Sequence, residues 1–405
     1  MQIGRVAQGR KLATDIVIDA KLADLENDPY PLYAEMRRDC PIAWVPETGR
    51  LWVTTWDLCA EAGNNYEVFG PTQQAFTIVY GQPNVMSLTG EAHLQARKPL
   101  DARFRPRAVN EFVDSIIRST AVRYIAEMRS RGQADLSADI LEPISLRAVG
   151  DVLGFTDVED TILSDWFRSL GAYLVNFGRD AATTAKGEDV KLQIRAYLEQ
   201  RLPEFCTRHN GSTLAHMFRD GLAEGQIRSI DEIIGTVGVM IVGGFQEPAH
   251  GAANTMLGLL SDPAQAKAVA DDPATHAEEA VKEGLRWIAP FGMTEKLTTA
   301  DVQLGGLMIP AGTEIALVIG SANRDEARFD QGSRFDLYRP QKAHASFGYG
   351  AHFCVGNYVA RRLAQVCVEE LFRGLPKLRL DPANEPVVHG WAVRAAKRLP
   401  VIWNP

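Results

Sequence analysis

The chain has 405 residues, 46% hydrophobic and 23% charged, which is the balance of an ordinary globular protein. Its formal net charge of −8, without a long basic run, excludes the electrostatic footprint of a nucleic-acid-binding protein. The N-terminal segment lacks an apolar stretch long enough for a signal peptide or a membrane anchor. Five scattered cysteines without CxxC pairing argue against disulfides and a structural zinc site. We therefore expect a cytoplasmic protein that binds neither nucleic acid nor membrane.

The hydrophobic pattern predicts a mainly α chain with a minor β part. Residues 26–46 carry apolar side chains at helical spacing, and LWVTTW at 51–56 is a strand candidate. From residue 91 to about residue 260 the pattern is helical, with a break predicted at 176–189. Residues 297–319 are typical of short strands joined by glycine and proline turns. No repeat or linker is visible, so we expect a single large domain spanning residues 1–405.

One long apolar segment, residues 229–260, contains a carboxylate and a helix breaker. Ser229 and Glu232 form an S-x-x-E capping box, which predicts a helix start. Pro248 has no N–H, so the helix should kink there. Gly243 allows a flat group to approach the backbone, and it shares a helix face with Glu247, four residues on. Taken alone, the segment favours a packing kink in which Glu247 reaches solvent or a partner.

A second segment, SFGYGAHFCVG at 346–356, places one cysteine in a glycine-punctuated loop. Cys354 could be a small buried hydrophobe. Its position before an amphipathic helix favours a thiolate, because the helix dipole and free N–H groups stabilise negative charge there. Gly350 and Gly356 let backbone amides approach the sulfur, and Phe347 would shield it from water. The pattern indicates an axial ligand for haem iron.

FGYGAHFCVG is similar to the haem-binding loop of the cytochromes P450, F-x-x-G-x-[H/R]-x-C-x-G. Other family motifs follow in order over residues 90 to 360: EAHLQARKPLDARFRP, KEGLR, SANRDEARF and FDLYRP. The chain is thereby identified as a member of this family. The resemblance implies the P450 fold and haem b as cofactor. We also expect no appended reductase domain, because the chain ends at IWNP.

The resemblance assigns roles residue by residue. Cys354 is implied as the thiolate ligand of the iron. The structural triad is implied to be Glu283, Arg286 and Arg339. Lys296 stands where relatives usually carry an arginine, so it offers a point charge without the bidentate fork. The implied haem-contacting residues are His93, Arg97, His352 and Lys296 at the propionates, and Phe347, Gly348, Gly350 and Gly356 in the cysteine loop.

The kinked helix departs from the family pattern. P450s usually read G-G-x-[D/E]-T here, an acid–alcohol pair that delivers protons for dioxygen activation. In this chain Gln246 stands at the acid position and Glu247 at the alcohol position. Glutamine cannot relay a proton as a carboxylic acid does, whereas burial should raise the pKa of Glu247 toward neutrality. Gln246 and Glu247 are the candidate catalytic residues.

Three short motifs, QEP, E-G-L-R-W and G-W-x-x-R, resemble bacterial P450s that O-demethylate lignin-derived methoxyphenols of the guaiacol and syringol type. Leu174 and Val393 stand where guaiacol-type relatives carry phenylalanine, so a larger ring such as syringol should fit better. Neighbouring side chains could instead refill that space. The implied substrate-binding residues are Tyr80, Met86, Leu174, Val239, Gly243, Met293, Thr294 and Val393.

The implied reaction is hydroxylation of a methoxy carbon on a small aromatic substrate, which gives a catechol-type product and formaldehyde. As a monooxygenase the protein would take electrons from NAD(P)H through a separate ferredoxin or flavin reductase, the route that family prevalence favours. As a peroxygenase it would use hydrogen peroxide, with Glu247 as general base and then acid. The alternatives are a P450 hydroxylase of an unrelated pathway, or a haem protein that binds a phenolic ligand with little turnover.

Overall fold

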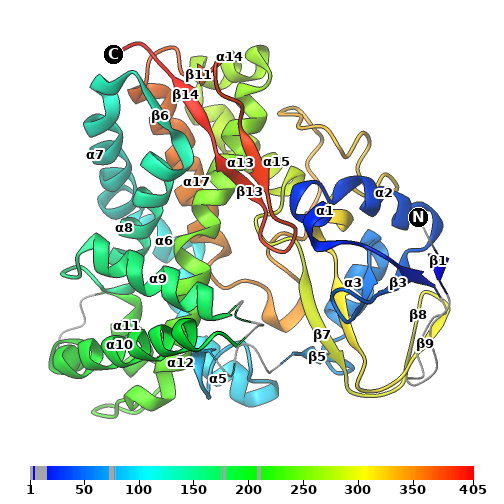
Figure 1. Cartoon of the computed structure of the whole chain (residues 1–405). Coiled ribbons are helices and arrows are strands. Elements are labelled where there is room, and N and C mark those ends of the chain that lie inside the picture. Colours follow the sequence, from blue (N-terminus) through cyan, green and yellow to red (C-terminus); the bar gives the residue numbers. More distant parts are fainter. Residues whose placement is uncertain are drawn as a thin grey trace.

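The computed structural model describes residues 3–4, 16–72, 77, 79–174, 176, 179–207 and 211–405. Most helices gather on one side of the molecule, and the largest sheet lies on the other (Figure 1). The predicted mainly α architecture with a minor β part is confirmed. The described α-helices are α1 (Leu22–Asn27), α2 (Tyr30–Asp39), α3 (Trp56–Asn64), α5 (Gly90–Phe104), α6 (Pro106–Phe112), α7 (Ser119–Met128), α8 (Glu142–Leu153), α9 (Asp160–Leu174), α10 (Ala181–Thr207), α11 (Thr213–Arg219), α12 (Ile230–Phe245), α13 (Glu247–Leu260), α14 (Pro263–Asp271), α15 (Pro273–Trp287), α16 (Ile319–Ala322) and α17 (Asn357–Gly374). Shorter π and 3-10 turns are η1 (Val113–Arg118), η2 (Arg129–Arg131), η3 (Leu136–Leu141) and η4 (Gly350–His352).

The largest sheet joins distant parts of the chain. Its order is β1-β2-β3-β4-β10-β7-β5, and β4 pairs in parallel with β10, with Leu51 opposite Ile315. Small sheets form in the orders β11-β14-β6, β12-β13 and β8-β9. The strands are β1 (Ile3–Gly4), β2 (Val17–Ile18), β3 (Ile42–Val45), β4 (Arg50–Val53), β5 (Phe69–Pro71), β6 (Gln133–Asp135), β7 (Thr294–Thr298), β8 (Val302–Leu304), β9 (Leu307–Ile309), β10 (Glu314–Leu317), β11 (Arg379–Leu380), β12 (Val387–His389), β13 (Ala395–Arg398) and β14 (Pro400–Ile402). The short strands predicted for residues 297–319 are confirmed.

Two boundaries differ from the sequence predictions. The strand predicted at 51–56 ends at Val53, because Thr55 is already the extended residue before α3. The break predicted at 176–189 is too long, since α10 begins at Ala181. Asp180 explains the early start: its carboxylate accepts hydrogen bonds from the amide and hydroxyl of Thr183, both at 2.7 Å, as an N-terminal capping residue does.

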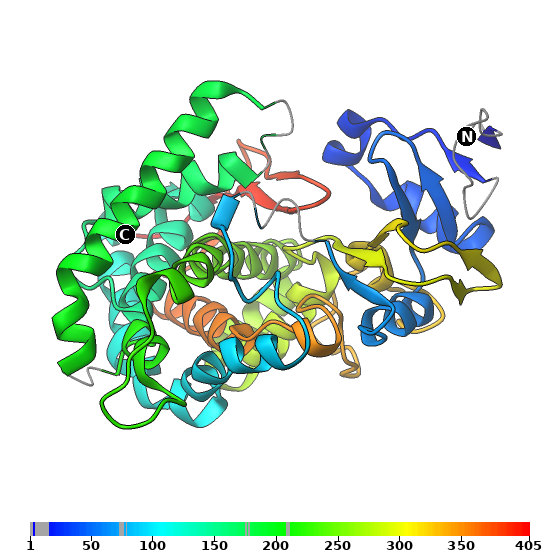
Figure 2. The same cartoon turned by 90° about the horizontal axis from the view of Figure 1, so that it is seen from below.

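The kink predicted in the long apolar segment is confirmed. Both hydrogen bonds of the Ser229–Glu232 capping box are present, one in each direction, at the start of α12. The helix is interrupted at Gln246, and Pro248 is within the first two residues of α13, where its missing N–H costs nothing. Seen from below, α12 and α13 run through the middle of the helical part (Figure 2). The apolar α13 packs against α15, α17 and β13, so it is held on several sides.

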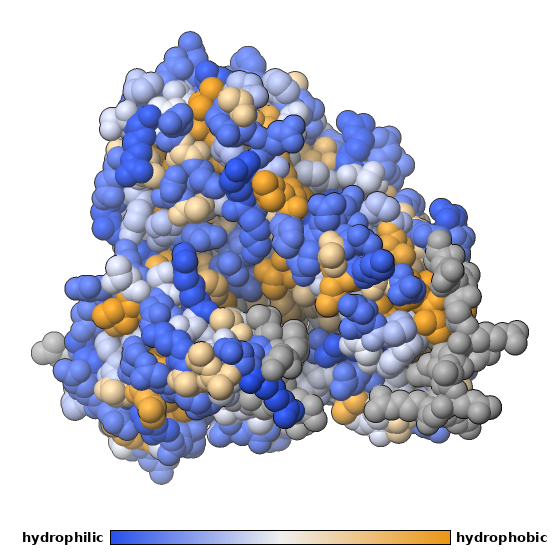
Figure 3. All heavy atoms as spheres, in the orientation of Figure 1, coloured by the Kyte–Doolittle hydropathy of each residue, from blue (hydrophilic) through white to orange (hydrophobic). Residues whose placement is uncertain are grey.

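The interior is divided between one large and two small hydrophobic cores. The large core lies among the helices, and the small ones lie against the faces of the main sheet. Figure 3 shows hydrophobic side chains in the hollowed part of the face between the helical and β-rich parts. Across the described residues, no helix is both long and apolar enough to cross a membrane.

Candidate functional site

The loop before α17 holds its cysteine in a fixed turn. The amide of Cys354 donates a 2.9 Å hydrogen bond to the carbonyl of Phe347, which closes the loop. Gly348 (φ +76°) and Gly350 (φ +62°) adopt the left-handed conformation that favours glycine. A Cβ at Gly350 would also come within 2.9 Å of the carbonyl of Gly63. These two positions therefore require glycine for local reasons.

Cys354 is exposed to solvent, although many protein atoms surround its thiol. Burial raises its pKa, and the charge of Glu247 adds to the rise, while the amide of Gly356 and the cations Arg97 and Arg361 oppose it. In the protein alone, desolvation therefore outweighs the stabilisation of a thiolate at the helix N-terminus. A metal cation at Sγ would reverse this balance, since a coordinating thiol loses its proton.

Four basic side chains from three elements lie together near this loop. The rings of His93 and His352 are 4.3 Å apart. Burial and the neighbouring His93, Lys296 and Arg97 lower the pKa of His352 to about 4. Asp101 accepts from Arg97 at 3.1 Å, and within the described part of the chain no other ion pair forms in the group.

This basic group fits the carboxylates of a bound cofactor. Lys296 is 5% exposed, and burial lowers its pKa. His93 Nε2 is buried with no partner among the residues that the structure describes. His352 Nε2 is 3.1 Å from the carbonyl of Leu88, which leaves Nδ1 for another contact. The cations Lys296 and Arg97 outnumber Asp101, the one carboxylate paired with the group, and the propionates of haem would neutralise this surplus.

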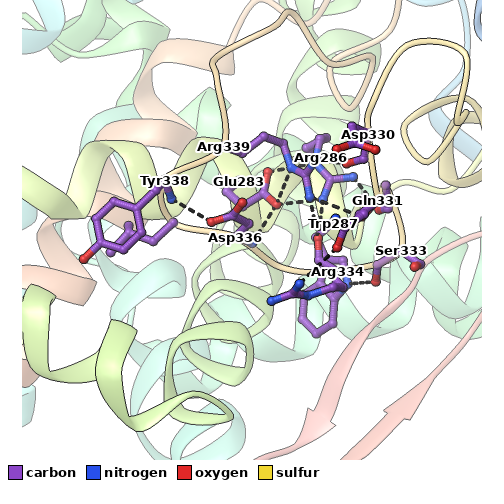
Figure 4. A network of polar contacts seen from close by, with 12 residues as sticks. Glu283, Arg286, Trp287, Asp330, Gln331, Ser333, Arg334, Asp336, Tyr338 and Arg339 are labelled. Carbon is purple, nitrogen blue, oxygen red and sulfur yellow. Dashed lines mark hydrogen bonds and ion pairs between the residues drawn. The ribbon is translucent and has the colours of Figure 1, made fainter.

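The predicted triad is formed, and it is buried. Arg286 donates two 2.7 Å hydrogen bonds to the carboxylate of Glu283, and Arg339 donates a third at 3.0 Å (Figure 4). The amide of Asp336 also donates to Glu283, at 2.9 Å. Arg286 donates further to the carbonyls of Asn323 and Gly332, at 2.9 and 2.7 Å. The triad thus ties α15 to the long segment that leads to the cysteine loop.

Asn323 continues this connection to the loop itself. Its carboxamide oxygen accepts from the amide of Ala345 at 2.7 Å, and its nitrogen donates to the hydroxyl of Ser346 at 2.8 Å. Ser346 donates in turn to the carbonyl of Leu285 at 2.6 Å. The residues immediately before Phe347 are therefore anchored to α15, next to the triad.

The helix kink places Glu247 in the interior. Oε2 of Glu247 is buried, and it has no partner in the described part of the protein. Burial raises the pKa of Glu247 to about 7, against the charge of Lys397. The charge of Glu247 also helps to raise the pKa of Cys354. One turn earlier, Gly243 is exposed, and a Cβ there would meet nothing within 4 Å. The open face at Gly243 fits a flat cofactor held between the kink and the cysteine loop.

The predicted substrate-binding residues come from several elements. Tyr80 packs against Gly238 of α12, where a Cβ would lie 2.9 Å from the Tyr80 ring. Burial raises the pKa of Tyr80, and the charge of Glu247 adds to the rise. Met293 is 5% exposed and belongs to a small core beside the sheet. Val393 pairs with Phe291 through an isolated backbone bridge. The remaining members lie at the edge of the large core, on the kinked helix or in β7: Met86, Leu174, Val239, Gly243 and Thr294.

Two polar residues near Glu247 were not predicted. His250 is 1% exposed on α13, and its Nε2 is 3.3 Å from Nζ of Lys397 on β13. The sequence offered one signal for His250, since it follows Glu247 by three residues in an apolar helix. Lys397 gave none, because 147 residues separate it from His250.

Comparisons with known proteins agree along the chain. A family model described as "Cytochrome P450" matches residues 181–382. The chain is 30% identical to the "Steroid C26-monooxygenase" of Mycolicibacterium smegmatis, over 92% of both chains. It is 27% identical to "Cytochrome P450 monooxygenase PikC" of Streptomyces venezuelae, over 99% of this chain and 97% of that one.

Solved structures show the same fold. The crystal structure of CalO2 superposes with a TM-score of 0.83 at 26% identity, covering 95% of this chain and 98% of that one. P450BioI in complex with an acyl carrier protein gives a TM-score of 0.83 at 23% identity, covering 93% and 99%. The chain therefore belongs to the cytochrome P450 family and is a monooxygenase, an oxidoreductase whose cofactor is haem b with a cysteine thiolate ligand.

Proposed function

We propose that this P450 O-demethylates a methoxyphenol, with syringol favoured over guaiacol. The observation that carries the proposal is Glu247, a half-buried residue whose Oε2 is buried, at the position where the family places an alcohol. The G-W-x-x-R motif adds support, because it forms one turn. Gly390 has a φ of +101°, and Arg394 donates to its carbonyl at 2.6 Å. The turn holds Val393 beside Phe291.

The chain's own residues would hold the cofactor as follows. Cys354 would bind the iron through Sγ, the basic group of His93, Arg97, Lys296 and His352 would take the propionates, and Gly243 would lie over the ring. Bound haem supplies the oxidising chemistry that inserts one oxygen atom into a methoxy C–H bond. The resulting hemiacetal loses formaldehyde and leaves a phenol. With dioxygen, the second oxygen atom leaves as water, and NAD(P)H supplies two electrons through a separate ferredoxin or flavin reductase.

A peroxide-driven route is a second candidate, and Glu247 favours it. With hydrogen peroxide the balance needs no reductase: one oxygen atom enters the methoxy group and the other leaves as water. Oε2 of Glu247 would accept a proton from the incoming peroxide and return it to the departing oxygen, as general base and then acid. A group whose pKa is about 7 is suited to both transfers near neutral pH. Gln246 cannot exchange protons in this way.

The pH dependence of the peroxide reaction follows from Glu247. Only the carboxylate accepts a proton, and burial raises the pKa of Glu247 to about 7. We therefore expect kcat/KM for peroxide to rise as the pH increases through about 7 and then to level off. Initial rates of formaldehyde release between pH 5 and pH 9 measure this. A profile that is flat across that window would contradict the assignment.

The size of the substrate pocket gives a second expectation. We expect syringol to bind more tightly than guaiacol, because Leu174 and Val393 leave more room than phenylalanine would. Val393→Phe should reverse the order of affinities and weaken the binding of syringol by about tenfold. Steric changes of a few carbon atoms in a hydrophobic pocket have effects of this size. Optical titration of the haem-loaded protein gives both dissociation constants. Val387→Phe, at a valine that is 41% exposed, is the matched control. Tighter binding of guaiacol by the unmodified protein would overturn the expectation.

A further inference from the structure

A polar cluster lies behind the kinked helix, where the surrounding core is apolar. His250 on α13 is 1% exposed, and Lys397 on β13 approaches its Nε2 at 3.3 Å. An ammonium has only donors, so Nζ donates and Nε2 accepts. The imidazole must then carry its own proton on Nδ1. That atom is buried and has no partner among the described residues.

Two unpartnered polar atoms therefore lie on one stretch of helix. Glu247 and His250 are three residues apart, so their side chains are neighbours on one face. Oε2 of Glu247 is an acceptor without a partner, and Nδ1–H of His250 is a donor without one. A buried donor or acceptor that is left unpaired destabilises the folded protein. A single water between the two atoms would satisfy both groups, as buried waters commonly do.

The same cluster extends toward the surface on its other side. The charged groups that face Lys397 are Glu142 at the start of α8, Glu247 and Glu26 of α1. Burial lowers the pKa of Lys397, and these carboxylates oppose the shift. Glu142 is half-buried and faces Arg168, which is exposed. The charges of Glu142 on the α8 side and of Glu247 at the kink thus both act on Lys397, which contacts His250.

We propose that Lys397 and His250 form a proton path that resupplies Glu247 from the α8 face. The inference rests on the proposed acid–base role of Glu247 and applies to the dioxygen route, in which two protons are taken up per turnover; in the peroxide route Glu247 returns the proton that it accepts and needs no resupply. A proton moves from Nζ of Lys397 to Nε2 of His250, while Nδ1 releases its own proton toward Glu247 through water. Lys397 is then recharged from the side of Glu142. No electrons move along the path, and His250, left with its proton on Nε2, regains its first tautomer when the imidazole ring rotates, so each group returns to its first state.

Two substitutions separate a proton path from a simple charge effect. Lys397→Arg keeps the positive charge, but a guanidinium does not release its proton. With dioxygen, NADH and a ferredoxin–reductase pair, we expect turnover of the haem-loaded protein to fall about tenfold in Lys397→Arg and in Lys397→Met, with a larger solvent isotope effect. His250→Phe should give the same loss. Arg398→Met, at the exposed next residue of β13, is the control and should change neither quantity.

A readout that does not depend on turnover is the pH at which the Glu247 carboxyl ionises. Infrared absorption measures this pH, because the band of the protonated Glu247 carboxyl disappears when the group ionises. The same band is absent from Glu247→Gln. We expect Lys397→Met to move this pH upward, because a cation that lowers the pKa of Glu247 is lost, and Lys397→Arg to leave it unchanged. If Lys397→Arg and His250→Phe turn over like the unmodified protein with an unchanged isotope effect, the path is wrong. If Glu247→Gln itself keeps full turnover, the acid–base role of Glu247 is wrong instead.

Discussion

Glu247→Gln is expected to lose peroxide-driven formaldehyde release by about 10²- to 10⁴-fold, the usual contribution of a positioned acid–base group. The amide keeps the size of the side chain but cannot accept and return a proton. Glu247→Ala should lose a similar factor. Haem content and the thiolate-type spectrum should be unchanged in both variants, because Glu247 lies at the helix kink and not in the cysteine loop. Rates of formaldehyde release per haem measure the effect.

Glu224→Gln provides the matched control, since this glutamate is exposed. It should turn over like the unmodified protein. A Glu247→Gln protein that retains full peroxide-driven activity would show that the buried carboxylate has another role. Loss of haem from that variant would instead place Glu247 among the groups that hold the cofactor.

Glu283→Gln is expected to destabilise the protein by about 3–5 kcal/mol and to abolish haem loading. The substitution removes the only negative charge in the triad, so Arg286 and Arg339, whose side chains are 3% and 9% exposed, remain as buried cations without a counter-charge. The segment that Arg286 and Asn323 anchor then loses its tie to α15. Denaturant unfolding and haem absorbance of the purified protein measure both effects.

A matched substitution at the surface tests whether burial of the triad is the cause of the expected loss of stability. Glu111 pairs with Arg107 at 4.0 Å, with side chains 68% and 96% exposed. Glu111→Gln should change the free energy of unfolding by well under about 1 kcal/mol, as solvent-exposed pairs do. Equal stability of Glu283→Gln and the unmodified protein would contradict the structural role of the triad.

The sequence allowed the parts of the site that depend on local signals to be predicted. Pro248 has no N–H, so the kink follows from its position alone, and the Ser229–Glu232 pair marks the start of the helix. The cysteine loop was predictable because Gly348 and Gly350 are required by backbone conformation. The partners of Glu283 followed from the resemblance to a family, and the structure places them within hydrogen-bond distance.

Properties that depend on three-dimensional surroundings could not be predicted in the same way. The pKa of the Cys354 thiol in the protein alone is set by desolvation, which acts against Gly356, Arg97 and Arg361, and sequence position before a helix does not reveal that balance. The contact of Lys397 with His250 joins residues far apart in sequence, so no pattern indicates it. The start of α10 was missed because the capping role of Asp180 was not considered.

The most direct test of the account is formaldehyde release from syringol by the purified, haem-loaded protein, given hydrogen peroxide and no reductase. We expect steady release, with one formaldehyde formed for each peroxide consumed productively, and its loss in Glu247→Gln. No release with peroxide, together with turnover once NADH and a ferredoxin–reductase pair are added, would contradict the role of Glu247 in peroxide activation and leave a reductase-dependent demethylase.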